Sequence, residues 1–518
     1  MRESPQTLYR DGTILTPGRD GPAAAMLVGD GTLLWVGPDP EAQRHVDAAD
    51  EVVQLDGRLV TPAFVDAHAH LSTTGAGLRG VDLSSSRSLA DALSRVESAA
   101  RAGAGRPVYV QSWDETAWPE GRPFTGAELD RATYGGVVYA PRVDGHSAVI
   151  SSALAAAARV ADADGRMPDG LVITEAHHRA RETFAAAVTP GQRRDDITLA
   201  LRTAAAAGIA LVHENGGPVV SSAEDLADVL HVAREGLVPE VVGYWAELVD
   251  SAERARELTR RHGARGLAGD LNVDGSIGSR TASLRAAYTD RPGQRGNAFL
   301  TAAQVRDHVA ACTEAGVQAG FHVIGDLGVD TVIAGMEAAA ERCGVAAFRR
   351  ARHRLEHVEM IDAKGVRRLA ALDVVASVQP AFDAFWGGSS GMYAERLGPA
   401  RAAGMNPLRT MLDAGLRVAL GSDSPVTPFA PWEAVRACVQ HHDADQRTTT
   451  QEAFRAHTVG GWQAAGHDDR GVLTAGQPAT FTVWESTARL PDLAAGAPAP
   501  SAVLTVSRGR TVHRAESS

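Results

Sequence analysis

Short apolar runs divide the chain into a β-rich beginning, a long middle and a β-rich end. Residues 7–59 carry apolar runs of a few residues separated by Asp-Gly turns, a pattern typical of antiparallel hairpins. Similar short apolar runs occur again at residues 479–484 and 501–512. We therefore predict a small β-sandwich assembled from both termini, from residues 1–60 and 472–518.

In the middle of the chain, short apolar strands alternate with Ala-rich helical segments. This alternation predicts an α/β fold, a TIM-like (β/α)8 barrel over residues 61–471. The eight strands are expected at Phe64 and at residues 208–213, 239–244, 271–273, 318–322, 354–357, 374–378 and 417–421. The pattern is irregular over about residues 80–200, where the strand-like runs 108–111 and 137–141 indicate an insertion after the first barrel strand.

Polar residues recur at the carboxyl ends of these strands, where a barrel gathers its functional groups. His68 and His70 lie one residue apart after the first strand, so an extended backbone turns both rings to the same face. His322, His357 and Asp423 end three later strands. One such histidine is ordinarily a core residue, but five residues at matching strand ends predict a metal site.

Composition narrows the possible partners. The chain has 51 basic and 63 acidic residues without a basic cluster, so we expect a small-molecule substrate rather than nucleic acid or an anionic membrane. No long apolar run occurs, none follows the charges at the start, and the protein is expected to be cytoplasmic. The three cysteines, Cys312, Cys343 and Cys438, are too scattered to indicate a disulfide framework or a thiolate zinc site.

Four motifs in combination resemble the metal-dependent amidohydrolase superfamily: P-A-F-V-D-A-H-A-H, H-V-I-G-D, R-L-E-H-V and G-S-D-S-P. V-D-G-H-S-A-V, V-D-G-S-I-G-S-R-T-A and Y-A-E-R-L-G-P make the chain similar to the YtcJ-like branch, amidohydrolase family 3, which includes N-substituted formamide deformylases. The resemblance covers nearly the whole chain. It implies hydrolysis of a non-peptide carbon-nitrogen bond in a small amide, an N-substituted formamide or a cyclic amide, and it suggests a homodimer.

The resemblance also implies roles for the strand-end residues. His68 and His70 would bind one divalent metal, expected to be Zn²⁺ with Mn²⁺ or Fe²⁺ as alternatives, while His322 and His357 bind a second ion or share the first. Such an ion lowers the pKa of its water and so provides a hydroxide nucleophile. Asp423 would be a ligand and also the catalytic proton shuttle to the leaving nitrogen, or else a helix cap before Ser424.

The sequence departs from the family at one informative position. Relatives commonly carry a lysine four residues before the Asp-Gly matching Asp274-Gly275, and its carbamate bridges two metals. Here that residue is Asp270, and the single lysine, Lys364, lies on an expected outer helix, so no carbamylated lysine is possible. Asp270 is shorter than a carbamylated lysine and is not expected to reach the same point. Glu214 could enter the metal cluster as the bridging carboxylate, or instead support a metal ligand or contact the substrate. Without such a bridge one metal is bound, and His357 would then contact the substrate.

Three further residues are predicted to bind the substrate. His146, in D-G-H-S, would orient it or stabilise a developing oxyanion, unless it only holds its loop through Asp144. Asp326 would anchor a ring near the substrate or cap a helix, and Arg280 would meet a substrate carboxylate or be structural. The adjacent pairs His177-His178 and His441-His442 are expected at the surface.

Two other functions remain open from the sequence. A mononuclear deaminase of a cyclic amidine is favoured if a single ion is bound, and a non-catalytic barrel protein if none is. Metal content and the released product distinguish these functions from amide hydrolysis.

Overall fold

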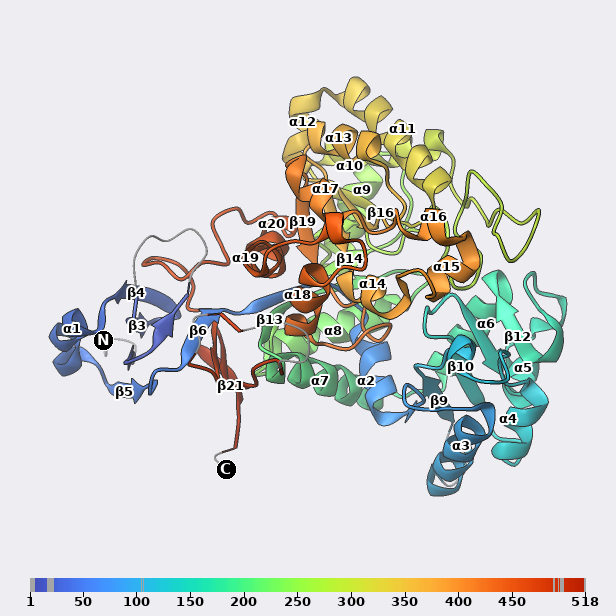
Figure 1. The fold of residues 1–518 in the computed structure, drawn as a ribbon, viewed down its shortest axis with the longest axis horizontal. Coiled ribbons are helices and arrows are strands. Elements are labelled where there is room, and N and C mark those ends of the chain that lie inside the picture. The colour runs from blue at the N-terminus through green and yellow to red at the C-terminus, as the bar shows by residue number, and fades with distance from the viewer. Residues whose placement is uncertain are drawn as a thin grey trace.

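The computed structural model describes residues 5–15, 23–103, 105, 107–487, 490–491, 493 and 498–516. At its centre eight parallel strands follow one another around a nearly closed barrel of the TIM type, as the sequence predicts (Figure 1). They are β7 (Phe64–Ala69), β13 (Ile209–Gly216), β14 (Glu240–Trp245), β15 (Gly266–Leu267), β16 (Gln318–Val323), β17 (Arg354–His357), β18 (Val375–Val378) and β19 (Arg417–Leu420). Past β19, Asp423 N donates to His68 O (2.7 Å) and His70 N to Ser424 O (2.9 Å), which joins the last strand to the first.

The fourth barrel strand lies earlier in the sequence than predicted. It is β15, Gly266–Leu267, and not residues 271–273. Gly269 bends the chain after it with a φ of +86°, and a Cβ there would lie 2.6 Å from Asn215 Oδ1. Beyond the bend the chain still follows β16, because His322 N donates to Leu271 O (3.2 Å) and Val273 N to His322 O (3.0 Å). The apolar run was therefore identified correctly as lying beside β16 but wrongly as the strand itself.

Helices surround the barrel, and their ends follow local sequence signals. They include α2 (Leu71–Arg79), α7 (Pro190–Ala206), α8 (Ala223–Glu235), α9 (Ala252–His262), α10 (Ala302–Ala315), α11 (Asp326–Cys343), α13 (Ala363–Ala371) and α18 (Pro431–Val439). For example, α10 begins with a capping box between Thr301 and Gln304 and ends at Gly316, which adopts a φ of +71°. Within the described residues, every helix is too short or too polar to cross a bilayer.

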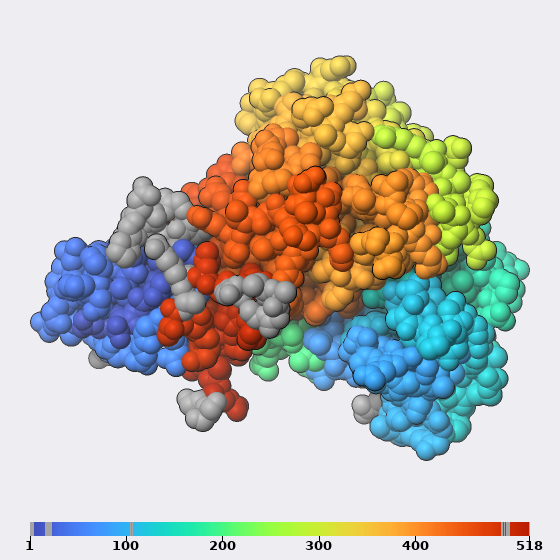
Figure 2. All heavy atoms as spheres, in the orientation of Figure 1, coloured from blue at the N-terminus to red at the C-terminus, as the bar shows by residue number. Residues whose placement is uncertain are grey.

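The insertion forms a lobe of its own beside the barrel, at the lower right of Figure 2. Its sheet has the order β12 (Leu171–Ile173), β11 (Ser147–Ile150), β10 (Val138–Pro141), β9 (Val108–Gln111), β8 (Val81–Asp82). Helices α3 (Leu89–Gly103), α4 (Gly126–Ala132), α5 (Ser152–Ala157) and α6 (Thr174–Ala186) accompany it. Trp113 and Phe124 pack in an apolar core of the lobe, separate from that of the barrel. The two strand-like runs seen in the sequence correspond to β9 and β10.

Strands from both ends of the chain form two further sheets, at the left of Figure 1. One has the order β4 (Thr32–Gly37), β3 (Ala25–Gly29), β1 (Gln6–Arg10), β5 (Glu51–Gln54). The other has the order β2 (Thr13–Ile14), β6 (Leu59–Pro62), β20 (Phe481–Trp484), β21 (Ala502–Ser507), β22 (Arg510–Arg514). Side chains of both sheets share one apolar core, in which the rings of Tyr9 and Phe481 meet edge to face at 5.1 Å. Because β6 leads directly into β7, these sheets fix the start of the barrel.

Candidate metal centre

Imidazoles and carboxylates from separate strands meet at the carboxyl end of the barrel. His68 lies in β7, His322 in β16 and His357 at the end of β17, while His70 precedes α2. Asp270 and Asp423 come from the segments that follow β15 and β19. Ligand-type atoms fall within 4.8 Å of one another in two sets: His68, His70 and Asp423, and His68, Asp270 and His357. The structure thus brings together all five residues that the sequence singled out, and it adds Asp270.

The two carboxylates face the same imidazole nitrogens. Asp423 Oδ1 lies 3.4 Å from His68 Nε2 and 3.2 Å from His70 Nε2. Asp270 Oδ1 lies 3.5 Å from His68 Nε2, and Asp270 Oδ2 lies 3.2 Å from His70 Nε2. Asp270 Oδ1 is also 3.7 Å from His322 Nδ1. His68 therefore stands between two acidic groups inside a nearly closed barrel.

Three of these imidazoles are anchored through the ring nitrogen that faces away from the cluster. His68 Nδ1 donates to Glu356 Oε2 (2.9 Å), His357 Nδ1 to Gln379 Oε1 (2.7 Å), and His322 Nε2 lies 3.4 Å from Gly275 O. A ring N–H donated in this way leaves the other nitrogen with a free lone pair, the state in which histidine binds metals.

The buried atoms that face inward lack protein partners. His68 Nε2 and Asp270 Oδ1 make no hydrogen bond within the described residues. Leaving such polar atoms buried and unsatisfied costs roughly 1–3 kcal/mol each. A divalent cation held by this nitrogen and oxygen donor set would remove that cost. The residues present therefore fit a divalent metal ion.

The mutual charges of the cluster keep its carboxylates ionised. Burial disfavours the charged form of Asp423, but the imidazoles of His68 and His70 lower its pKa below the ordinary value. Burial likewise opposes the charged form of His68, while Asp423 and Asp270 raise its pKa. Carboxylates in this state can bind a cation or accept a proton.

The backbone is strained at two of the cluster residues. His357 has a φ of +69° and Asp423 a φ of +56°, in the left-handed region that non-glycine residues avoid. Such a conformation costs about 1–3 kcal/mol and persists where surrounding contacts enforce it, often at functional sites. Here it turns the two side chains out of the strand alternation and into the cluster.

Glu214, proposed from the sequence as a bridging ligand, is bonded elsewhere. Its Oε2 accepts from the backbone N–H of Leu71 (2.8 Å) at the start of α2. Burial and the nearby Asp225 raise the pKa of Glu214 to about 8. In the structure Asp270, and not Glu214, lies among the imidazoles, although its side chain is shorter than a carbamylated lysine.

Glu356, the carboxylate that orients His68, is not among the residues predicted from the sequence. Glu356 is fully buried, and Arg354 donates to both of its oxygens at 2.6 and 2.8 Å. Arg354 also donates to Ala67 O (2.7 Å) and so fixes Glu356 against β7. The sequence signal for Glu356 is its spacing in R-L-E-H. Arg354 and Glu356 lie two residues apart, which places both side chains on the same, inner face of a barrel strand.

His146 reaches the cluster from the insertion. Its ring centroid lies 5.1 Å from that of His322. Asp144 accepts from His146 N (3.2 Å) through one oxygen and from Ser276 Oγ (3.0 Å) and Ser279 Oγ (2.8 Å) of the barrel through the other. Burial and the neighbouring His322 lower the pKa of His146 to about 4, so the ring is neutral near pH 7. The loop-stabilising role of Asp144 is thus present and places His146 beside the candidate metal ligands.

Other residues predicted at the site or at the surface lie elsewhere. The Arg280 guanidinium pairs with Asp290 (Nε to Oδ2, 3.0 Å), and Asp326 accepts from Arg285 N (2.8 Å) at the first turn of α11. These are structural contacts rather than free groups that await a substrate.

Two histidines expected at the surface are buried instead. His177 is 2% exposed and His441 is 4% exposed. His177 lies against the sheet of the insertion, with its Nε2 2.8 Å from Tyr139 Oη.

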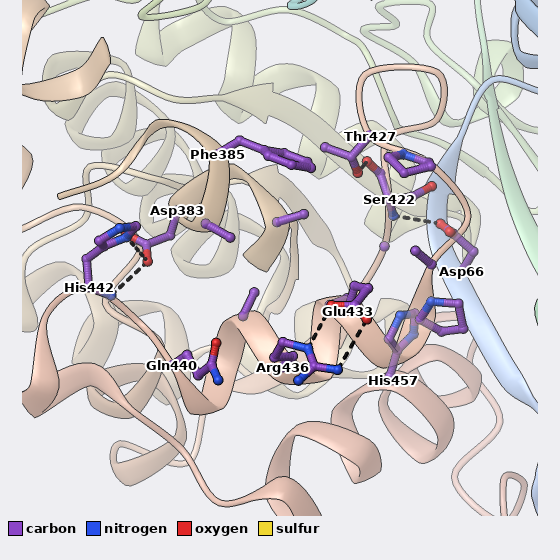
Figure 3. Close-up of a pocket in the computed structure, with 18 residues that line it drawn as sticks. Asp66, Asp383, Phe385, Ser422, Thr427, Glu433, Arg436, Gln440, His442 and His457 are labelled. Atoms are coloured by element: carbon purple, nitrogen blue, oxygen red, sulfur yellow. Dashed lines mark hydrogen bonds and ion pairs between the residues drawn. The ribbon is translucent and has the colours of Figure 1, made fainter. Parts of the chain in front are cut away.

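A separate cavity of about 400 Å³ lies between the end of β19 and α18 (Figure 3). Asp66, Ser422 and His457 line one side, and Asp383, Phe385 and His442 line the other. The carboxylate of Asp66 accepts from His68 N (3.2 Å) and Ser422 N (3.0 Å). Asp66 therefore joins the strand that carries His68 to the segment that carries Asp423. It does so from the side that faces the cavity.

Comparison with known proteins places this geometry in a family. The profile described as the amidohydrolase family matches residues 51–513. YtcJ of Bacillus subtilis is 23% identical over 519 aligned positions, which cover 92% of this chain and 94% of YtcJ. The N-substituted formamide deformylase of Arthrobacter pascens is 23% identical over 506 positions, covering 90% of each chain.

A solved structure supports the same assignment. A crystal structure of an uncharacterized metal-dependent hydrolase from Pyrococcus furiosus superposes with a TM-score of 0.72 at 25% identity, covering 92% of this chain and 98% of that chain. Together these matches confirm the resemblance predicted from the motifs.

Proposed function

The chain belongs to the amidohydrolase family, and from this premise we propose that it hydrolyses a carbon-nitrogen bond, other than a peptide bond, in a small amide, an N-substituted formamide or a cyclic amide. The observation that carries the proposal is the convergence of His68, His70 and Asp423, with His357 and Asp270, within ligand distance at the carboxyl end of the barrel. We expect Zn²⁺ as the cation. The chemistry that a divalent cation supplies in such a centre is Lewis acidity, which polarises a carbonyl and lowers the pKa of water.

Asp423 is the residue that moves protons in this reaction. Its side chain is 12% exposed and ionised, and its Oδ1 lies 3.2 Å from His70 Nε2. Among the described residues no arginine or lysine forms an ion pair with it, so it lies beside the donor set with its charge available. It accepts a proton from the attacking water and delivers it to the leaving nitrogen, which must be protonated before the bond breaks.

His146 is the residue that contacts the substrate. A neutral imidazole next to His322 can donate one hydrogen bond to a carbonyl oxygen as negative charge develops on it. Because the insertion carries His146, its loops also decide which substrates reach the centre. The similarity to a formamide deformylase supports small acyl groups, such as formyl, as the first to be tested.

The test is an assay of purified, zinc-loaded protein against three compounds. These are an N-benzyl formamide, a five-membered cyclic amide and a cyclic amidine, with detection of formate, ring-opened acid and ammonia respectively. We expect turnover of the formamide or the cyclic amide that is lost in the Asp423→Asn variant. Ammonia release from the amidine alone would make the protein a deaminase, and a zinc-loaded protein without turnover of any compound would favour a non-catalytic barrel.

A further inference from the structure

Asp270 occupies a position in the cluster that its local backbone holds firmly. The bend at Gly269 turns the chain into the barrel, and the residues after Asp270 are hydrogen-bonded to β16, the strand that supplies His322. The Asp270 side chain is 14% exposed. The carboxylate is therefore fixed among the imidazoles by the same elements that fix His322.

The separations around Asp270 are those of ligands that share an ion. Donor atoms held about 2.1 Å from one ion in a tetrahedron lie about 3.4 Å from each other. The nitrogen-oxygen separations between Asp270 and His68, His70 and His322 are 3.5, 3.2 and 3.7 Å. By contrast His68 Nδ1 and Glu356 Oε2 are 2.9 Å apart, an ordinary hydrogen bond of the same ring.

The charges around Asp270 also favour a cation at this point. Among the described residues, the basic groups within 4 Å of the Asp270 carboxylate are the imidazoles of His68, His70 and His322, and none is an arginine or lysine. Asp423 faces two of the same imidazoles. Two carboxylates close to the same buried imidazoles repel each other, and a divalent cation between them would offset that repulsion.

We propose that Asp270 is a direct metal ligand. Its Oδ2 faces His70, its Oδ1 faces His68 and His322, and it thereby connects the two sides of the centre. A side-chain carboxylate needs no carbamylation, and the single lysine, Lys364, is exposed on α13. The centre therefore assembles without carbon dioxide. This inference shares with the proposed function only the requirement for a metal.

The experiment compares zinc binding by the full chain and by its Asp270→Asn variant. Each protein is stripped with chelator and titrated with Zn²⁺ against a competing chromophoric chelator, in buffer freed of carbon dioxide and again with added bicarbonate. We expect wild type to bind zinc equally in both buffers. Asp270→Asn should bind at least about 10-fold more weakly, since even the outer partners of metal ligands contribute 10- to 100-fold. Asp330→Asn, which removes a carboxylate paired with Arg285, is the matched control and should bind like wild type.

Thermal unfolding in chelator distinguishes a ligand from a structural residue. Each protein is compared with its own unfolding temperature in chelator, so that any effect of the substitution on the metal-free fold is subtracted. Added zinc should then raise the unfolding temperature of wild type more than that of the variant.

Three results would overturn the proposal: an unchanged zinc affinity in Asp270→Asn, a requirement of wild type for bicarbonate, or an equal rise in the unfolding temperature of both proteins when zinc is added. Failure of the proposed function is a different result, because wild type would then bind zinc through Asp270 and hydrolyse none of the amides.

Discussion

Two groups of buried histidines in this barrel differ in how many of their ring nitrogens are hydrogen-bonded to protein atoms. His308 on α10 and His353 before β17 have both nitrogens bonded to protein atoms. His308 accepts from Val249 N and lies against Leu267 O, both at 3.1 Å. His353 accepts from Ala319 N (2.9 Å), and its other nitrogen lies 2.8 Å from Thr313 Oγ1.

At the carboxyl end of the barrel, His68 and His357 are buried to the same extent but have only the outward nitrogen anchored. Burial alone therefore does not distinguish a structural histidine from a metal ligand. What distinguishes the ligand group is that its inward side meets two carboxylates, Asp270 and Asp423, and other imidazoles at about the separation of ligands that share an ion. The predictions below test this difference.

The largest effect is expected for Asp423→Asn. An amide cannot accept the proton of the attacking water, so kcat/KM should fall about 10³-fold, within the range of general acid-base catalysis. Steady-state kinetics on zinc-loaded protein measures it, with zinc content determined on the same sample. His353→Gln, four residues before His357, is the control and should keep its zinc and its activity. If Asp423→Asn retained more than a tenth of wild-type activity, another group would move the proton.

The next effect concerns His146, which belongs to neither group of histidines because it lies on the insertion. His146→Ala removes a donor to the substrate oxygen, and kcat should fall about 10²-fold, as for loss of one oxyanion-stabilising donor. Zinc content should stay unchanged, because the ring contacts His322 without being among the candidate ligands. Loss of zinc together with activity would instead make His146 part of the metal centre.

A smaller effect is expected for Glu356→Gln, which changes the outer partner of His68. Gln still reaches Nδ1 but lacks the charge that fixes the ring tautomer, so zinc affinity should fall between about 10- and 100-fold. The chelator competition described for Asp270 measures it. Gln379, the neutral partner of His357, supplies the comparison, since Gln379→Ala should weaken zinc binding less than Glu356→Gln. Equal losses would show that the charge of the partner is unimportant.

The sequence predicted this architecture because barrel strands and their polar ends follow regular patterns. The apolar runs located the strands, and the polar residue after each run located His68, His70, His322, His357 and Asp423. Two features lay outside such patterns. The left-handed backbone at His357 turns Glu356 and His357 inward together, whereas strand alternation places neighbours on opposite faces. The bend at Gly269 carries Asp270 into the cluster, although side-chain length alone suggested that it would fall short.

The smallest effect is expected on the free energy of unfolding. It concerns His353, one of the histidines with both ring nitrogens hydrogen-bonded. Burial, and then the neighbouring His308, lowers the pKa of His353 to about 3 in the folded chain, compared with about 6.5 when unfolded. Between these values the unfolded chain binds more protons, so the contribution of His353 to stability is complete above pH 6.5 and is lost as the pH falls toward 3. Protonation of Nδ1 would also break its hydrogen bond with Ala319 N.

At pH 5.5 this loss is on the order of 1 kcal/mol relative to neutral pH. His353→Gln keeps an acceptor and a donor but has no group that titrates in this range. Its urea midpoints at pH 7.5 and 5.5, measured in chelator so that metal release does not contribute, should therefore lie closer together than those of wild type. The same separation in both proteins would mean that the ring of His353 is already protonated in the folded chain, and the contrast between the two groups of histidines would no longer hold.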